Sequence, residues 1–222
     1  MGDPVRSAGR FGPIEWAIAS RSRPGEQYCG DQAIAAAIDG DTDSPPNPSP
    51  VAALFGVMDG LGHGPDAARA AETAAEALAG ARGERLEVLI ELCHRVLGGT
   101  RGVAMTLARI DFQTGQMSWT GVGNVSAHLV AKTVSGVQSR ASARLVGGIV
   151  GYRIPETRPA QVVSIRTGDL LVITSDGIAD DHLEHLDFAA SAKDIVEQIL
   201  TKHAKETDDA MVLAARHRGI TT

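Results

Sequence analysis

The sequence contains few cysteines, and it has no long apolar run. Its two cysteines, Cys29 and Cys93, stand far apart, so neither a disulfide framework nor a cysteine-based zinc site is indicated. No stretch approaches the roughly 20 apolar residues of a membrane helix, and the first residues lack the apolar core of a signal peptide. We therefore expect a cytoplasmic protein without a membrane partner.

Positive charge is also scarce. Lysine and arginine number 21 against 27 aspartates and glutamates, a formal net charge of -6, and no basic run could neutralise a row of backbone phosphates. Nucleic acid is therefore not an expected partner. A chain of 222 residues can bury one sizeable core. We expect a single domain over residues 1–222, with residues 1–12 and 218–222 loosely ordered.

Apolar patterns predict strands joined mostly by short turns, interrupted by helices. The four prolines of residues 40–50 exclude a regular element and predict a surface loop. Expected strands are 14–20, 32–39, 51–58, 103–112, 116–122, 126–132, 161–166, 169–174 and 210–216, and expected helices are 67–79, 84–97 and 188–204. This order predicts a layered α+β fold rather than a doubly wound parallel sheet.

Aspartates recur where the expected strands begin or end. Asp31 precedes one strand, Asp59 and Asp176 each follow one, and Asp208 and Asp209 precede the last. Any one of them alone is more often a turn residue, so their joint placement carries the inference. Carboxylates that converge at one sheet edge repel one another unless divalent cations compensate, and hard oxygen ligands suit magnesium or manganese.

Glycines flank three of these aspartates, at positions 30, 60 and 177. Without a Cβ, the backbone can turn sharply and offer a carbonyl to a metal ion. Two cations can lower the pKa of a shared water and neutralise the oxygens of a phosphate ester during in-line attack. The pattern therefore predicts metal-assisted hydrolysis of a phosphomonoester.

The sequence around these positions resembles the metal-dependent type 2C protein phosphatases, in the bacterial branch of the sporulation stage II E and RsbX-like stressosome phosphatases. The matching segments follow the family order: residues 29–31 (CGD), 55–71 (FGVMDGLGHGPDAARAA), 110–115 (the ID and TG of a hairpin), 121–124 (GVGN), 171–178 (LVITSDGI) and 208–212 (DDAMV). The resemblance implies a four-layer α-β-β-α sandwich, in which two mainly antiparallel sheets are flanked by helices.

The resemblance also implies two divalent metal ions, Mn²⁺ or Mg²⁺. Asp59 would bridge both, the carbonyl of Gly60 would contribute, and Asp176 and Asp208 would complete the ligands of the second. Asp59 and Asp176 are thereby candidate catalytic residues, and Asp31 would act directly or through a water. The full set of candidate metal residues is Asp31, Asp59, Gly60, Asp176, Asp208 and Asp209.

His63 is a candidate catalytic acid for the leaving serine oxygen, because an imidazole titrates near neutral pH. The two residues before it depart from the eukaryotic spacing, and a structural histidine is the alternative. No counterpart of the eukaryotic phosphate-gripping arginine is evident; Arg21, Arg23 or Arg101 could substitute, unless each is a solvated surface residue.

Two further groups are interpreted as bystanders. His182 and His185 stand among acidic residues, a composition that could bind a transition metal, but the position predicts a solvated surface loop. Cys29 precedes the Gly30–Asp31 pair, and we interpret it as a thiol without a catalytic role.

The resemblance implies hydrolysis of phosphoserine or phosphothreonine on signalling proteins, of the stressosome-scaffold or anti-sigma-antagonist type, to reset a stress response. Two alternatives stay open. One is a phosphatase-fold binding module without turnover. The other is a histidine-kinase-type ATP-binding domain, suggested by the glycine-rich turn after Asp59; that fold requires an asparagine-bearing helix upstream, which the sequence lacks.

Overall fold

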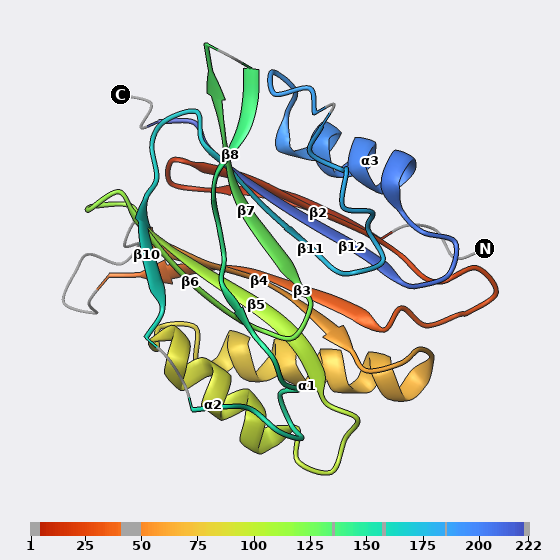
Figure 1. Ribbon diagram of the computed structural model, residues 1–222. Helices are drawn as coiled ribbons and strands as arrows, with labels where there is room; N and C mark the ends of the chain where they lie inside the picture. Colours follow the sequence, from red (N-terminus) through yellow and green to blue (C-terminus); the bar gives the residue numbers. More distant parts are fainter. Residues whose placement is uncertain (1–4, 41–49, 135, 157–158, 185, 220–222) are drawn as a thin grey trace.

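The computed structural model describes residues 5–40, 50–134, 136–156, 159–184 and 186–219. Two sheets face each other; helices α1 (Pro65–Gly80) and α2 (Leu86–Val96) lie against one of them, and α3 (Ala192–His203) lies against the other (Figure 1). The α-β-β-α layering implied by the resemblance is confirmed. Among the described residues, no helix has the length and apolarity that a membrane crossing requires.

Each sheet is mainly antiparallel. The first sheet runs β1 (Val5–Phe11), β2 (Ile14–Arg21), β12 (Ala210–His217), β11 (Leu170–Thr174), β7 (Ser126–Thr133) and β8 (Gly136–Ser142). The second sheet runs β10 (Gln161–Ser164), β6 (Gln116–Val122), β5 (Val103–Asp111), β4 (Pro50–Gly60) and β3 (Asp31–Asp39), and β9 (Leu145–Val146) pairs with β6 in parallel.

The continuous apolar run of β4 follows from its central position. Successive side chains of a strand point to opposite faces. Phe55 and Val57 therefore pack between the two sheets, while Leu54 and Met58 pack against α1 and α2. Both faces of the strand are buried, so no polar residue interrupts the run until the strand reaches Asp59 at the end of the sheet.

The structure corrects several boundaries. The prediction that residues 1–12 are loosely ordered is wrong for Val5–Phe11, which pairs along its whole length with β2. The third helix begins at Ala192 rather than at 188, because the Ser191 side chain caps it by accepting the N–H of Asp194. The short strands β8 and β9 were not expected.

The predicted surface loop and the predicted loose carboxyl end fall largely outside the described residues. Of the expected loop 40–50, residues 41–49 are not described, and Pro50 already belongs to β4. At the carboxyl end, Arg218 is held in place, since its N–H donates to the Pro13 carbonyl, and residues 220–222 are not described.

Candidate active site

Strand pairing brings the predicted aspartates to one end of the sandwich. Asp31, the first residue of β3, stands directly opposite Asp59 near the end of β4. The other three aspartates belong to the first sheet. Asp176 follows β11, and Asp208 and Asp209 precede β12, which is the antiparallel neighbour of β11. These five residues, the carboxylate cluster, are drawn from four strand ends in two sheets.

Ser175 joins the two sheets at this cluster. Its hydroxyl donates to the Asp31 carboxylate at 2.6 Å and accepts the Met211 N–H at 2.9 Å. A single buried hydroxyl therefore ties β12 and the end of β11 to the start of β3. The sequence analysis assigned Ser175 no role, although it lies in the matching segment 171–178.

Asp209 organises the connection between β2 and β3. Its carboxylate accepts the N–H of Arg23 at 2.7 Å and the N–H of Gly30 at 2.8 Å, and the side chain is buried. Each of the two carboxylate oxygens of Asp209 thus accepts a hydrogen bond from a backbone N–H within the protein. Asp209 positions the loop that leads into Asp31.

The glycines of the two Asp-Gly turns are required by close packing. A Cβ at Gly60 would collide with the carbonyl of Ala67 in α1, and a Cβ at Gly177 would collide with the carbonyl of Asp209. The backbone therefore approaches more closely here than any side chain permits. This approach sets the turn after β4 against the first turn of α1.

Burial and mutual repulsion raise the pKa values of three carboxyl groups of the cluster. The pKa of Asp59 is raised to about 7, first by burial and then by the charges of Asp176 and Asp208. Burial, followed by the charge of Asp59, holds the pKa of Asp31 well above its usual range. Burial and Asp208 also raise the pKa of Asp176. The cluster thus carries more negative charge than its surroundings stabilise.

Asp176 is held by two groups that the sequence analysis did not assign to the site. The Asn124 side chain donates its Nδ2 to the Asp176 carboxylate at 2.6 Å, and the Lys205 ammonium donates to the Asp176 backbone carbonyl at 2.6 Å. Asn124 could have been found, because it ends the matching segment 121–124.

The donor set suits a hard divalent cation, since carboxylate and carbonyl oxygens surround an excess of negative charge. Within the part of the chain that the structure describes, however, no three or more His, Cys, Asp or Glu side chains are arranged to hold a metal ion by themselves. A cation here would also draw on backbone carbonyls and on water, as Mg²⁺ commonly does in proteins.

His63 lies at the rim of the site. Its Nδ1 is 2.8 Å from the Glu26 carboxylate, which belongs to the β2–β3 connection, and 51% of its side chain is exposed. No recorded hydrogen bond joins its ring to the carboxylate cluster among the described residues. The catalytic acid role of His63 therefore stays a prediction.

The three candidate arginines differ in their partners. Arg21 donates to a backbone carbonyl and pairs with Glu206. The Arg23 guanidinium has no recorded partner within the described part of the chain, although its backbone N–H is bound to Asp209. Arg101 lies farther from the cluster, beside Gly62 in the turn that follows β4. Arg23 is thus the candidate that is both adjacent to the cluster and available.

The predicted bystanders have different outcomes. The solvated setting expected for His182 is wrong: the ring is buried, bonds the Ala179 carbonyl through Nδ1 and packs edge-on against His128. Burial lowers the pKa of His182. His185 lies outside the described residues. Burial raises the pKa of Cys29 to about 12, so its thiol stays protonated near neutral pH.

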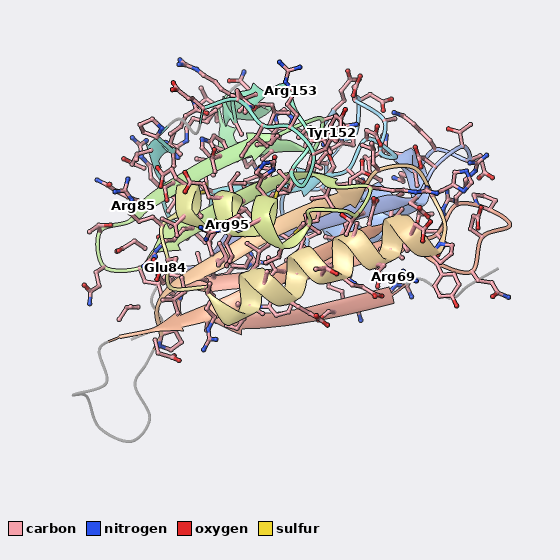
Figure 2. The ribbon with its side chains drawn as sticks, turned by 90° about the horizontal axis from the view of Figure 1, so that it is seen from below. Arg69, Glu84, Arg85, Arg95, Tyr152 and Arg153 are labelled. Carbon is pink, nitrogen blue, oxygen red and sulfur yellow. The ribbon has the colours of Figure 1, made fainter. Side chains whose placement is uncertain are left out.

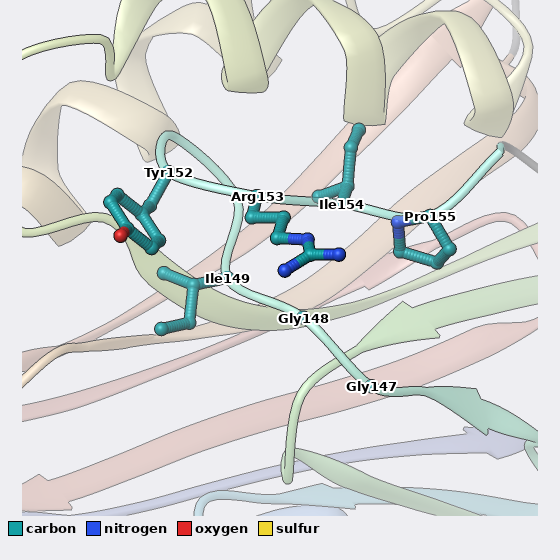
Figure 3. Close-up of a pocket in the computed structure, with 7 residues that line it drawn as sticks. All are labelled: Gly147, Gly148, Ile149, Tyr152, Arg153, Ile154 and Pro155. Carbon is teal, nitrogen blue, oxygen red and sulfur yellow. The ribbon is translucent and has the colours of Figure 1, made fainter.

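A pocket of about 490 Å³ lies close to the site but contains none of its acids. Its loop is attached to the start of β5 by the pairing of Val150 with Val103. Figure 3 shows the loop folding back on itself, with Ile149 facing Tyr152 and Arg153 between its two arms. The chemistry must therefore be sought in the carboxylate cluster, outside this pocket.

Comparison with known proteins identifies relatives of the whole chain. The chain is 23% identical over 197 residues to the phosphoserine phosphatase RsbX of Bacillus subtilis (strain 168). The aligned region covers 88% of this chain and 91% of RsbX. A chain from work on the bacterial stressosome, "a modular system that has been adapted to control secondary messenger signaling", is 31% identical, with a TM-score of 0.77 over 91% of this chain and 99% of that one.

The crystal structure of RsbX in complex with magnesium has the same fold, with 20% identity and a TM-score of 0.78 over 95% of this chain and 98% of that one. The family model for stage II sporulation protein E (SpoIIE) matches residues 50–218. That range includes Asp59, Asp176 and Asp208 and covers most of the sequence. The chain belongs to the stage II sporulation protein E family.

Proposed function

We propose that this chain is a metal-dependent phosphatase that hydrolyses phosphoserine or phosphothreonine on signalling proteins. The observation that carries the proposal is the carboxylate cluster, in which burial and neighbouring charges raise the pKa of Asp59 to about 7. Family membership supports the same chemistry and does not favour a silent binding module or a histidine-kinase-type ATP-binding domain. By analogy with the relatives, its substrates are scaffold or antagonist proteins of a stress-signalling complex.

The proposed cofactor is a pair of divalent cations, Mg²⁺ or Mn²⁺. Asp59 would hold both, the carbonyl of Gly60 would contribute a ligand, and Asp176 and Asp208 would complete the ligands of the second ion. Asp31 stands opposite Asp59 and would act through a ligand bond or a water. Magnesium in the RsbX structure supports the choice of a hard cation.

When bound, the cations supply positive charge at the phosphoryl oxygens and acidify a water for in-line attack. The residues of the chain prepare this step. Asp59 and Asp176 act as ligands in their ionised form, which burial and neighbouring charges disfavour without a cation, and Asn124 keeps the Asp176 carboxylate in place. Asp209 holds the loop that carries Asp31 and Arg23.

The leaving serine oxygen must gain a proton as its bond to phosphorus breaks. His63 is the proposed donor, and the Glu26 carboxylate, 2.8 Å from its Nδ1, orients the ring. Arg23 is the proposed phosphate-binding residue, since its guanidinium is free among the described residues and can bind two phosphoryl oxygens at once.

The proposal is tested with p-nitrophenyl phosphate and a phosphoserine peptide, each with Mg²⁺, with Mn²⁺ and with chelator. We expect turnover that requires the metal and falls by more than about a hundredfold in Asp59→Asn, which removes a proposed ligand of both ions. Asp39→Asn, at the exposed far end of β3, is the matched control and should keep full activity. Metal-independent turnover, an active Asp59→Asn, or no turnover of either substrate contradicts the proposal.

A further inference from the structure

A second pocket, of about 340 Å³, lies beside the turn that follows Asp59. Helix α1 forms one wall, and the segment before β5 forms the other. Arg69 stands on α1 on the lower face of the molecule, apart from Arg95 on α2 (Figure 2). The lining residues are Asp66, Arg69, Ala70, Gly99, Thr100 and Arg101.

The β4–β5 pair fixes how far this pocket is from the cluster. Asp59 pairs with Ala104, and beyond the paired strands the N–H of Leu61 donates to the carbonyl of Gly102. Arg101 therefore stands opposite Gly62, where an added Cβ would come within 2.9 Å of its Nη1. Gly62 is three residues from Asp59, and a chain spans at most about 3.3–3.6 Å per residue, so the part of the turn that faces Arg101 lies within about 10 Å of Asp59.

Both arginines of this pocket are available to a ligand. The exposed Arg69 guanidinium has no recorded partner in the described ranges. Arg101 contacts the Asp66 carboxylate and the His63 carbonyl, each at 3.5 Å, a separation at which a hydrogen bond is weak. Its side chain is 49% exposed. Two guanidinium groups and one carboxylate, that of Asp66, thus line the pocket and leave it with an excess of one positive charge, in a chain whose formal net charge is -6.

We propose that Arg69 and Arg101 form a subsite for an anionic side chain of the protein substrate, a carboxylate or a second phosphoserine. The anion lies two or three residues from the phosphoserine that is hydrolysed, because an extended peptide spans about 3.3–3.6 Å per residue, which matches the distance from the cluster. The guanidinium fork binds carboxylate and phosphate oxygens in pairs. This inference rests on the proposed function and specifies its substrate class.

The subsite is tested with phosphoserine peptides that differ only at the positions two and three residues from the phosphoserine. These positions carry aspartate, a second phosphoserine or asparagine. We expect wild-type kcat/KM to be about tenfold higher for the anionic peptides than for the asparagine peptide. Two partly exposed ion pairs between the peptide anion and the arginines account for a difference of this size. The Arg69→Gln/Arg101→Gln double variant should bring this ratio close to one.

The ratio is the readout, so a general loss of turnover cancels. Arg95→Gln removes an exposed arginine that does not line the pocket and should leave the ratio unchanged. The aspartate and phosphoserine arms show which anion the subsite prefers. Equal kcat/KM on all peptides in the wild type, or a preference that survives in the double variant, overturns the inference.

A failure of the proposed function is distinguishable from a failure of the subsite. If no peptide is hydrolysed, the phosphatase proposal fails, and fluorescence anisotropy of the same labelled peptides still tests the subsite. Tighter binding of the anionic peptides to the wild type than to the double variant supports it. Equal affinities for the two proteins overturn it.

Discussion

Ser175→Ala is the substitution for which the structure predicts the most specific effect. The hydroxyl donates to Asp31 and accepts the N–H of Met211, so it links two sheets that face each other across the core. Alanine fits the same space and removes only the oxygen. Asp31 then loses the donor that lowers its pKa, and the Met211 N–H loses its acceptor.

The expected loss of stability follows from these two groups. A hydrogen bond to an ionised carboxylate contributes about 1.5–3 kcal/mol, and a buried N–H left without an acceptor costs about 1–3 kcal/mol. Because both interactions share one hydroxyl, we expect a total of about 2–4 kcal/mol. The lower value applies at acidic pH, where Asp31 holds its proton, and the loss grows as the pH rises and Asp31 ionises.

Urea unfolding of the metal-free protein measures this loss through the fluorescence of Trp16 and Trp119, both buried between the sheets. The matched control is Ser126→Ala, at the same end of the first sheet, where one hydroxyl bonds the Thr174 hydroxyl at 2.8 Å. That control should lose only about 0.5–1.5 kcal/mol. Equal losses in both variants, or a loss in Ser175→Ala that does not depend on pH, would refute the cross-sheet role.

The remaining predictions concern protons and metal. The pKa of Asp59 is about 7 in the folded protein, against an ordinary 3.8, so the protonated carboxyl stabilises the fold below about pH 4. This stabilisation, at most about 4 kcal/mol, is lost as the pH rises to about 7. Calorimetric melting of the metal-free protein should show the melting temperature fall over this range, and a flat profile contradicts the prediction. His63→Gln should slow hydrolysis of alkyl phosphates more than of p-nitrophenyl phosphate, whose leaving group hardly needs a proton; equal losses remove the acid role. Asn124→Ala should weaken metal binding about tenfold in titration calorimetry because the Asp176 carboxylate loses its donor; an unchanged affinity contradicts this.

The strands that sequence analysis located are those with buried faces. β4 is apolar on both sides because it is central in its sheet, and such a run can be recognised from residue type alone. β1 could not be recognised in this way, because it is an edge strand whose residues between Val5 and Phe11 are all small or charged. Its place depends on Trp16, whose ring lies against Gly9, where an added Cβ would come within 2.9 Å.

The aspartates could be predicted as a group, but their individual positions could not. Asp208 and Asp209 are neighbours in the sequence, yet only Asp209 is buried and bound to two backbone N–H groups. Strand ends predict convergence, whereas the partner of each side chain depends on contacts between the two sheets. Ser175 and Asn124 were missed for the same reason, since each acts on a residue far away in the sequence.

These contacts between the sheets explain why the site and the fold are coupled at this end of the molecule. Two hydrogen-bonded groups cross from the first sheet to the second, Ser175 to Asp31 and Asp209 to the N–H of Gly30. Burial of the carboxylates and repulsion among them oppose these bonds, and the two effects together raise the pKa of Asp59. A divalent cation would replace this repulsion with attraction and would bind only the folded arrangement, so its binding energy adds to the stability of the fold. Metal binding would therefore stabilise the end of the sandwich at which buried carboxylates repel one another.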